Sequence, residues 1–142
     1  MDIDIIIPIY NAFDFVKKCI ETVIEHTDLT QHTLLLVNDK STDERILPLL
    51  NSFIKENQSL NIILIDNKDN QGFVRTVNIG MQYSHHDVVL LNSDTEVTRN
   101  WLSKIQNCAY SKPAVATVTP LSNNATLASV PIFWQKTPFL QV

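Results

Sequence analysis

Short apolar runs that alternate with segments of helical period constrain the fold of this chain more than any other feature. Each run is rich in Ile, Val and Leu, and apolar and polar residues do not alternate along it. Continuous apolar character of this kind is typical of strands that are covered on both faces. The predicted strands span residues 3–9, 33–37, 62–65, 88–91 and 114–118.

The segments between these runs carry apolar residues at helical spacing. Pro48 suits only the first turn of its helix, or else interrupts it. Alternation of strand and helix predicts an α/β fold with a mostly parallel sheet, helices on both faces and right-handed crossovers. The four apolar stripes are Phe13, Val16, Ile20, Val23 and Ile24; Ile46, Leu49, Leu50, Phe53 and Ile54; Phe73, Val77, Ile79 and Met81; and Trp101, Leu102, Ile105 and Cys108.

Length and charge narrow the class of protein. With 142 residues, of which 44% are hydrophobic, the chain can form one domain with a core but not two ordinary ones. We place an α/β domain over residues 1–120 and an irregular arm without a clear period over residues 121–142. A net charge of −4 and the lack of a basic run argue against nucleic acid as a partner.

Localisation follows from features that the sequence lacks. No apolar run approaches the roughly 18 residues of a membrane span, and the first ten residues have no basic start of a signal peptide. Cys19 and Cys108 lack metal-ligand spacing and suggest ordinary reduced thiols. We therefore expect a cytoplasmic protein, and docking at the inner face of the membrane stays open.

Polar residues follow each of the first four predicted strands. Ligands of open parallel sheets bind at the carboxyl ends of the strands, so these residues are the first candidates for a site. They read "PIYN", "NDKSTD", "DNKDNQG" and "NSDTE".

The segment after the second strand has a structural and a functional interpretation. Ser41 or Thr42 with Glu44 fits a capping box at the start of a helix, together with Asp43. Asp39 is not needed for that cap. It could instead accept a hydrogen bond from the imide nitrogen of a pyrimidine base.

Gly72 and Gly80 are the only two glycines of the chain. Gly72 precedes a predicted helix, whose N-terminus can receive an anion, and Arg75 lies one turn into that helix. A plain turn and a solvated arginine would explain the same residues. Gly80 lies inside the helix and favours close packing of the helix on the sheet.

Asp94 and Glu96 follow the fourth strand and can together hold a hard divalent cation that also bridges a diphosphate. A polar loop after a strand is the simpler alternative. Asn92 is a poor ligand for such a cation but can bond a ribose hydroxyl. The four histidines lack metal-ligand spacing, and we interpret them as surface or structural residues.

Together and in this order, the four segments resemble the inverting nucleotide-sugar glycosyltransferases of family 2. The resemblance covers residues 3–101, and it implies the GT-A fold, whose nucleotide-binding half is a Rossmann-like sheet. It also implies a divalent cation, Mn²⁺ or Mg²⁺, and a nucleoside-diphosphate sugar as donor for polysaccharide biosynthesis. The segments that carry it are "IIIPIYN", "VNDKSTDE", "DNQGFVRTVNIG" and "DVVLLNSDTEV".

The resemblance assigns roles to the strand ends. The ends of the first two strands would form the base pocket, and Asp39 would accept a hydrogen bond from the base. Such a hydrogen-bond acceptor suits UDP or dTDP, although a guanine imide would also donate to it. Arg75 would lie near the base or the diphosphate. The expected nucleotide-sugar-binding residues are Pro8, Ile9, Tyr10, Asp39, Gly72, Arg75, Asn92 and Ser93, and the expected metal ligand is Asp94.

Two motifs depart from the family pattern. Asn38 and Lys40 replace the first and third residues of the usual Asp-Asp-Gly-Ser-x-Asp, whereas Asp39 is retained. Asn92 stands where the Asp-x-Asp metal motif more often begins with aspartate, which moves the expected ligand to Asp94. Whether Glu96 joins the metal site stays open.

The segment after Glu96 contains no Asp, Glu or His. An inverting transfer needs a carboxylate that takes the proton of the attacking hydroxyl, and the family supplies it after the metal motif. We therefore expect a truncated donor-binding half that binds nucleotide weakly and transfers little or no sugar alone, its catalytic base unknown. A missing second half would bind the glycan or lipid-linked acceptor, and the arm, with Phe133, Trp134 and Phe139, suggests self-association.

Two other interpretations compete. A non-catalytic nucleotide-sugar-binding or scaffold module would explain the missing base. A receiver-type signalling domain is also a small doubly wound sheet, but it requires an acidic pair after the first strand, where this chain has Tyr10 and Asn11.

Overall fold

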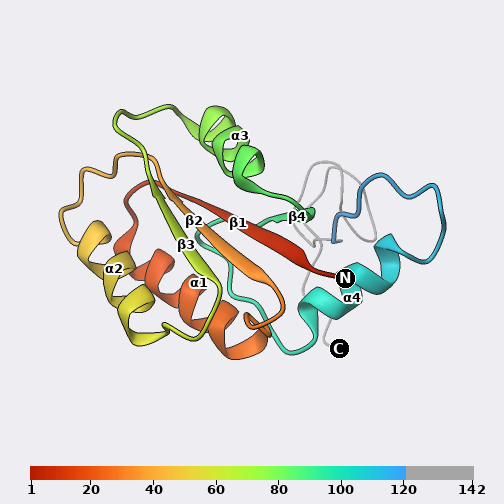
Figure 1. Ribbon diagram of the computed structural model, residues 1–142. Coiled ribbons are helices and arrows are strands. Elements are labelled where there is room, and N and C mark those ends of the chain that lie inside the picture. The colour runs from red at the N-terminus through yellow and green to blue at the C-terminus, as the bar shows by residue number, and fades with distance from the viewer. Residues whose placement is uncertain (121–142) are drawn as a thin grey trace, which may run out of the picture. The chain divides into compact units, whose positions relative to one another are not determined.

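The computed structural model describes residues 1–120 and divides the chain into two compact units, Met1–Arg99 and Asn100–Val142 (Figure 1). The first unit holds the sheet and three helices. The second begins with helix α4 (Trp101–Ala109), as predicted. The expected C-terminal arm, with Phe133, Trp134 and Phe139, lies outside the described residues.

Strands and helices alternate through the whole first unit. Its four strands are parallel and lie in the order β3-β2-β1-β4, so the chain starts in the interior of the sheet and builds outward on both sides. The elements are β1 (Ile3–Ile9), α1 (Phe13–His26), β2 (Thr33–Asn38), α2 (Ile46–Glu56), β3 (Ile62–Asp66), α3 (Phe73–Tyr83) and β4 (Asp87–Leu90). The predicted parallel α/β fold is confirmed, and Pro48 lies in the first turn of α2.

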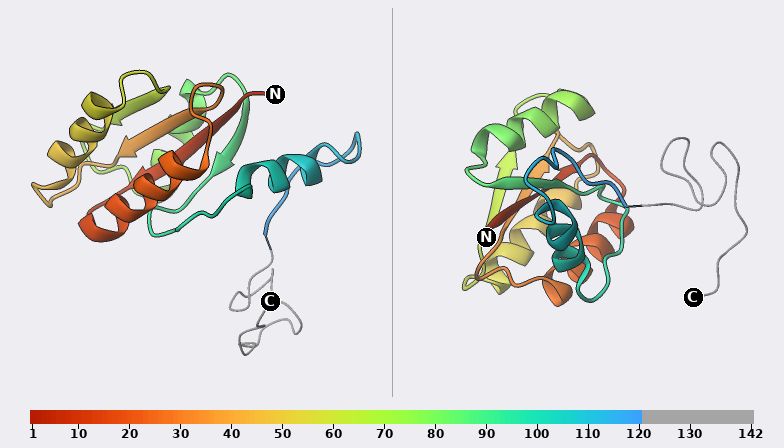
Figure 2. Two further views of the ribbon diagram at one scale, coloured as in Figure 1. Left: turned by 90° about the horizontal axis from the view of Figure 1, so that it is seen from below. Right: turned by 90° about the vertical axis from the view of Figure 1, so that its right-hand side faces the viewer.

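Helices cover both faces of this sheet. Helices α1 and α2 lie on one face and α3 on the other, which the edge-on view makes clear (Figure 2). All seven residues of β1 are buried, because this strand lies between two neighbours and beneath helices on both sides. The apolar character of residues 3–9, which only Asp4 interrupts, follows from that position.

The fifth predicted strand was wrong. Residues 114–118 form turn and irregular backbone in the second unit, and Val115 is exposed. A strand exists only when a neighbouring strand pairs with its backbone groups. In the described part of the chain, every paired strand belongs to the first unit.

The buried face of α3 also differs from the predicted stripe. Phe73 and Met81 are 56% and 45% exposed, whereas Thr76, Val77 and Gly80 are buried. Small residues therefore lie between this helix and strands β1 and β2, which it contacts. The stripe was wrong at its bulky ends because close packing selects small side chains here.

Gly80 permits that close approach, as predicted. A Cβ atom added to it would lie 2.7 Å from Cγ2 of Ile6 and 3.2 Å from Cγ2 of Val37. Both neighbours are wholly buried and branched at Cβ, so neither methyl group can swing away freely.

We expect Gly80→Ala to lower the free energy of unfolding by about 1–2 kcal/mol, since overpacking of the core outweighs the helix propensity that alanine gains. Urea unfolding followed by circular dichroism measures the change. The matched control is Asn78→Ala on the exposed side of α3, which should leave stability unchanged or slightly higher. A Gly80→Ala protein as stable as that control would contradict the packing.

The amino ends of the strands carry a separate polar cluster. Nδ1 of His32 accepts the N–H of Ile3, and Nδ1 of His86 lies 3.3 Å from the buried carboxylate of Asp4. His32 is buried and therefore structural, as predicted.

None of the helices within residues 1–120 combines the length and apolar character that a membrane span needs.

Candidate functional site

The carboxyl ends of the strands bring four loops to one edge of the sheet. Because β1 lies between β2 and β4, it separates the Asp39 loop, which follows β2, from the loop after β4 that carries Asp94. Across the sheet, the ends of β3 and β4 are three strand spacings apart, about 14 Å, and along the sheet β4 ends level with Ile6, before the end of β1. Gly72 and Arg75 therefore belong to the side of the site that is opposite Asp94.

Asp39 is the most constrained polar residue at this edge. Its side chain is 3% exposed, and both carboxylate oxygens accept hydrogen bonds from the loop between β3 and α3. The N–H of Gln71 donates to Oδ1 over 2.7 Å, the N–H of Gly72 donates to Oδ2 over 2.9 Å, and the amide of Asn67 donates to Oδ1 over 3.0 Å. The carboxylate thus occupies the N-terminus of α3, where the sequence suggested that a ligand anion could bind.

These bonds favour the ionised form of Asp39. Burial raises the pKa of the carboxyl, but hydrogen bonds from Gln71, Asn67, Thr76 and Gly72 outweigh it and hold the pKa below the ordinary value. The charge is therefore retained at neutral pH and faces the positive end of the α3 dipole.

Asp39→Asn should lower the free energy of unfolding at pH 7 by about 2 kcal/mol, because an amide nitrogen would face backbone N–H donors. A depressed pKa contributes stability that is present above the unfolded-state pKa and is lost as pH falls through the folded-state value. The difference from wild type should be constant above about pH 5 and shrink below about pH 4.

Urea unfolding at a series of pH values measures this difference. Asp69→Asn in the same loop is the matched control, because that carboxylate is exposed and its loss should change little. A constant difference for Asp39→Asn down to pH 3 would show that its carboxylate is not the source of the stability.

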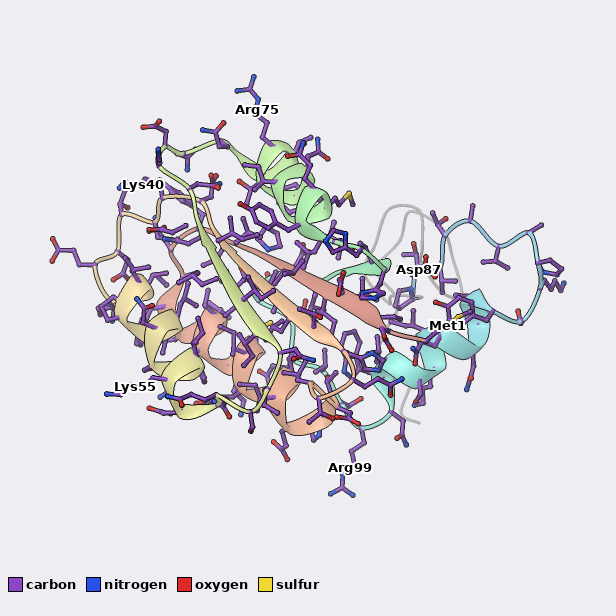
Figure 3. The ribbon with its side chains drawn as sticks, viewed as in Figure 1. Met1, Lys40, Lys55, Arg75, Asp87 and Arg99 are labelled. Carbon is purple, nitrogen blue, oxygen red and sulfur yellow. The ribbon has the colours of Figure 1, made fainter. Side chains whose placement is uncertain are left out.

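Gly72 and Arg75 flank the start of α3. Gly72 has φ 75° and ψ 163°, a conformation that is essentially limited to glycine, and an added Cβ would meet no atom within 4 Å. Glycine is thus required by the backbone and not by packing. The Arg75 side chain projects away from α3 into solvent and forms no ion pair within residues 1–120 (Figure 3).

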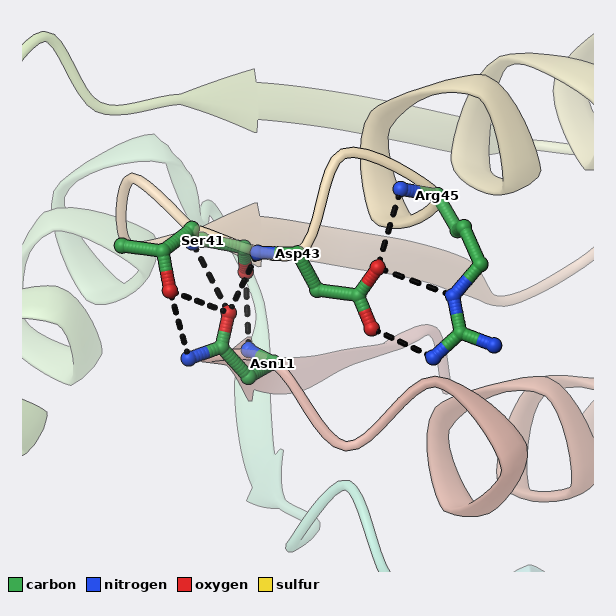
Figure 4. A network of polar contacts seen from close by, with 5 residues as sticks. Asn11, Ser41, Asp43 and Arg45 are labelled. Atoms are coloured by element: carbon green, nitrogen blue, oxygen red, sulfur yellow. Dashed lines mark hydrogen bonds and ion pairs between the residues drawn. The ribbon is translucent and has the colours of Figure 1, made fainter.

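Asn11 organises the loop between β2 and α2, a role that sequence reasoning missed. Its Oδ1 accepts the N–H groups of Thr42 and Asp43 over 2.8 and 2.9 Å, and its own N–H donates to Oγ of Ser41 over 2.9 Å (Figure 4). Asn11 has φ 59°, which asparagine tolerates better than most residues. Its position two residues after the end of β1 was the one local signal.

The predicted capping box was wrong in its partners. Helix α2 begins at Ile46, and Asp43 accepts the N–H of Arg45 over 3.0 Å, whereas Ser41 and Thr42 bond Asn11. The Arg45 side chain forms two more bonds to Asp43 and lowers the pKa of its carboxyl to about 2 (Figure 4). Asn11, distant in sequence, competes successfully for the hydroxyl groups.

Lys40 adopts a left-handed conformation with φ 57° in the loop after β2 (Figure 3). Glycine occupies this position in the Asp-Asp-Gly-Ser-x-Asp motif that the segment resembles, and glycine adopts such a conformation without steric cost. Lysine there strains the backbone by roughly 1 kcal/mol. Asp39 and Asn11 hold the residues on both sides of Lys40 in place through hydrogen bonds.

Replacing this lysine tests the strain. Lys40→Gly should raise the free energy of unfolding by about 0.5 kcal/mol, since relief of strain exceeds the extra entropy of glycine in the unfolded chain. The matched control is Lys55→Gly in α2, which should lower stability by about 1 kcal/mol. Equal losses for both variants would contradict the strain.

The end of β1 offers one accessible side chain. Pro8 and Ile9 are buried within the strand, whereas Tyr10 is 50% exposed. Of these three expected pocket residues, Tyr10 is the one whose side chain can touch a ligand.

The loop after β4 carries the exposed acidic residues. The N–H of Leu91 still pairs with the carbonyl of Ile6, and the chain then turns so that the N–H of Thr95 donates to the carbonyl of Asn92 over 3.1 Å. Asn92, Asp94 and Glu96 are exposed, and Ser93 is half-buried. Neither carboxylate forms an ion pair within residues 1–120, so both are free to bind a cation.

A complete cation site is not formed by side chains alone. Within the described residues, no group of three or more His, Cys, Asp or Glu side chains is placed to hold a metal ion. Two exposed carboxylates nevertheless fit a cation that takes its remaining ligands from a diphosphate and water.

Comparison with known proteins shows which family this chain matches. The family model described as "Glycosyl transferase family 2" matches residues 4–134. Polypeptide N-acetylgalactosaminyltransferase 11 of Xenopus tropicalis is 31% identical over 104 residues, which are 71% of this chain and 17% of that protein. The receiver-type alternative is thereby excluded.

Solved structures share the fold. The mannosyltransferase PcManGT from Pyrobaculum calidifontis, in complex with GDP-Man and Mn²⁺, has a TM-score of 0.72 and 17% identity, covering 78% of this chain and 32% of its own. Residues 1–349 of TarS from S. aureus, in complex with UDP-GlcNAc, have a TM-score of 0.64 and 19% identity, covering 75% of this chain and 30% of their own. The chain thus spans about a third or less of the length of each of these proteins.

Proposed function

The chain belongs to glycosyl transferase family 2, and from this premise we propose that its strand ends bind the nucleoside diphosphate of a sugar donor together with a divalent cation. The sugar would pass to a hydroxyl acceptor, a glycan or a lipid-linked glycan, with inversion. The observation that carries the proposal is the exposed loop 92–96, whose unpaired carboxylates lie beyond β4, next to the strand that ends at the exposed Tyr10.

The base would lie on the side of β1, β2 and β3. The half-exposed ring of Tyr10 offers a stacking surface, and Arg75 supplies a cation near the start of α3. Asp39 supports this half by fixing the loop at Gln71 and Gly72, and a base imide would share a carboxylate that already accepts three hydrogen bonds. A uracil or thymine base is our first expectation.

The diphosphate would lie on the side of β4. Asp94 would bind Mn²⁺ or Mg²⁺, with Glu96 as a second oxygen donor and Asn92 and Ser93 facing the ribose or the sugar. Hard cations of this type are held by one or two carboxylates plus phosphate oxygens. When bound, the cation neutralises the charge that develops on the leaving nucleoside diphosphate.

The attacking side of the reaction has no assigned residue. Inversion requires a base that takes the proton of the acceptor hydroxyl, and the sequence after Glu96 has no Asp, Glu or His. A second candidate function, a non-catalytic nucleotide-sugar-binding module, rests on the same observation.

Two further proposals come from the sequence alone. They are self-association through Phe133, Trp134 and Phe139, and docking at the inner face of a membrane.

Calorimetry of the chain with UDP, dTDP, GDP and CMP, each with and without Mn²⁺, tests the proposal. We expect UDP or dTDP to bind, and Mn²⁺ to tighten binding at least tenfold. Asp94→Asn should remove that gain, because the amide contributes no charge to the cation. The control is Glu56→Gln, an exposed carboxylate at the end of α2.

Binding that is independent of Mn²⁺, or equally Mn²⁺-dependent in Asp94→Asn, would refute the cation site. Transfer of the sugar by the chain at about 1 s⁻¹, ordinary for enzymes, would exclude the non-catalytic module.

A further inference from the structure

The loop that carries Asp94 and Glu96 lies against helix α1. Two side chains of that helix, Cys19 and Thr22, lie one turn apart and form hydrogen bonds to the loop at Asn92 and Val97. Cys19 is 0% and Thr22 7% exposed; the bond to Val97 is buried, and the bond to Asn92 is partly buried. The two bonds bracket the exposed carboxylates.

Thr22 is oriented by its own helix. Its hydroxyl donates to the carbonyl of Cys19 over 3.0 Å, which uses its single proton, and the hydroxyl oxygen then accepts the N–H of Val97 over 3.1 Å. Val97 is buried, so its N–H would be left unpaired without this acceptor. The hydroxyl is therefore the group that fixes the C-terminal end of the loop.

Cys19 fixes the other end. Its Sγ lies 3.6 Å from the carbonyl oxygen of Asn92, which also accepts the N–H of Thr95. Burial raises the pKa of the Cys19 thiol to about 11, so the sulfur keeps its proton at neutral pH and can donate it. The negative charge of Asp94 adds to this rise in the pKa, whereas a hydrogen bond from the backbone of Thr95 opposes it.

We propose that Cys19 and Thr22 are positioning residues that set the affinity of the site for its cation. This inference rests on the proposed function, because it assigns the two residues to the cation site of Asp94. A ligand on a free loop must be ordered when the cation binds, whereas a loop held at residues 92 and 97 presents its carboxylates in place. Supporting hydrogen bonds of this kind typically change metal affinity by about 10–100-fold.

Thr22→Val tests the role, since valine keeps the shape of threonine and removes the hydroxyl. We expect the Mn²⁺ concentration that gives half-maximal UDP binding to rise about tenfold. Thr22→Ser should restore the wild-type value, because serine keeps the oxygen. Cys19→Ala should raise the Mn²⁺ midpoint in the same direction as Thr22→Val, and it serves as the test if Thr22→Val does not fold.

A purely structural role is separated by a control on the same helix. Val23→Ala removes buried methyl groups of α1 and should lower the melting temperature without moving the Mn²⁺ midpoint. Amide exchange in the absence of ligand adds a direct readout: the N–H of Val97 should be protected in wild type and in Thr22→Ser, and exchange faster in Thr22→Val.

The outcomes distinguish the two proposals. If wild type binds UDP with Mn²⁺ and Thr22→Val has the same midpoint, the positioning role is overturned and the proposed function stands. If Val23→Ala moves the midpoint as far as Thr22→Val, the positioning role is also overturned. If the wild-type chain binds no nucleotide with Mn²⁺, the proposed function fails and the inference fails with it.

Discussion

A buried carboxylate holds together the loops on which the candidate site is built. Asp39 directly follows the second strand and accepts the backbone N–H groups of Gln71 and Gly72, so the turn before α3 is bonded to the end of β2. Its charge lies at the positive end of a helix dipole, where a carboxylate is most stable. The position of the turn before α3, and with it that of Arg75 in the first turns of the helix, follows from this one interaction.

The sheet could be predicted because its cause is local. Residues 3–9 are apolar except for Asp4 and show no alternation, and the structure buries all seven of them. Residues 114–118 have the same appearance and form no strand, because strand formation depends on a partner that composition does not reveal. The face of α3 failed for a related reason: Gly80 and Thr76 pack on the sheet while Phe73 is exposed, and apolar periodicity ranks these residues the other way.

The sequence predicts where a site could lie, but not which hydrogen bonds hold its loops in place. Asp39 and Asp94 are candidates from the sequence because each lies in a segment that follows a strand. The hydrogen-bond partners of Asp39 and of Asn11 could not be predicted, since they lie about 30 positions away in the chain. Hydrogen bonds across such separations are set by the fold. The same limit hid Thr22, which looks like an ordinary residue of a helix until the loop after β4 is seen to rest on it.

The start of α1 has a consequence for how this protein can vary. Two consecutive residues without the freedom of glycine, Asn11 and Ala12, have φ 59° and 58°, and Lys40 has φ 57° in the adjoining loop. Valine, isoleucine and threonine are poorly tolerated at such angles. Backbone conformation therefore limits which substitutions residues 11, 12 and 40 tolerate, independently of any ligand. The limit applies even at positions 12 and 40, which are exposed to solvent and have room for a larger side chain.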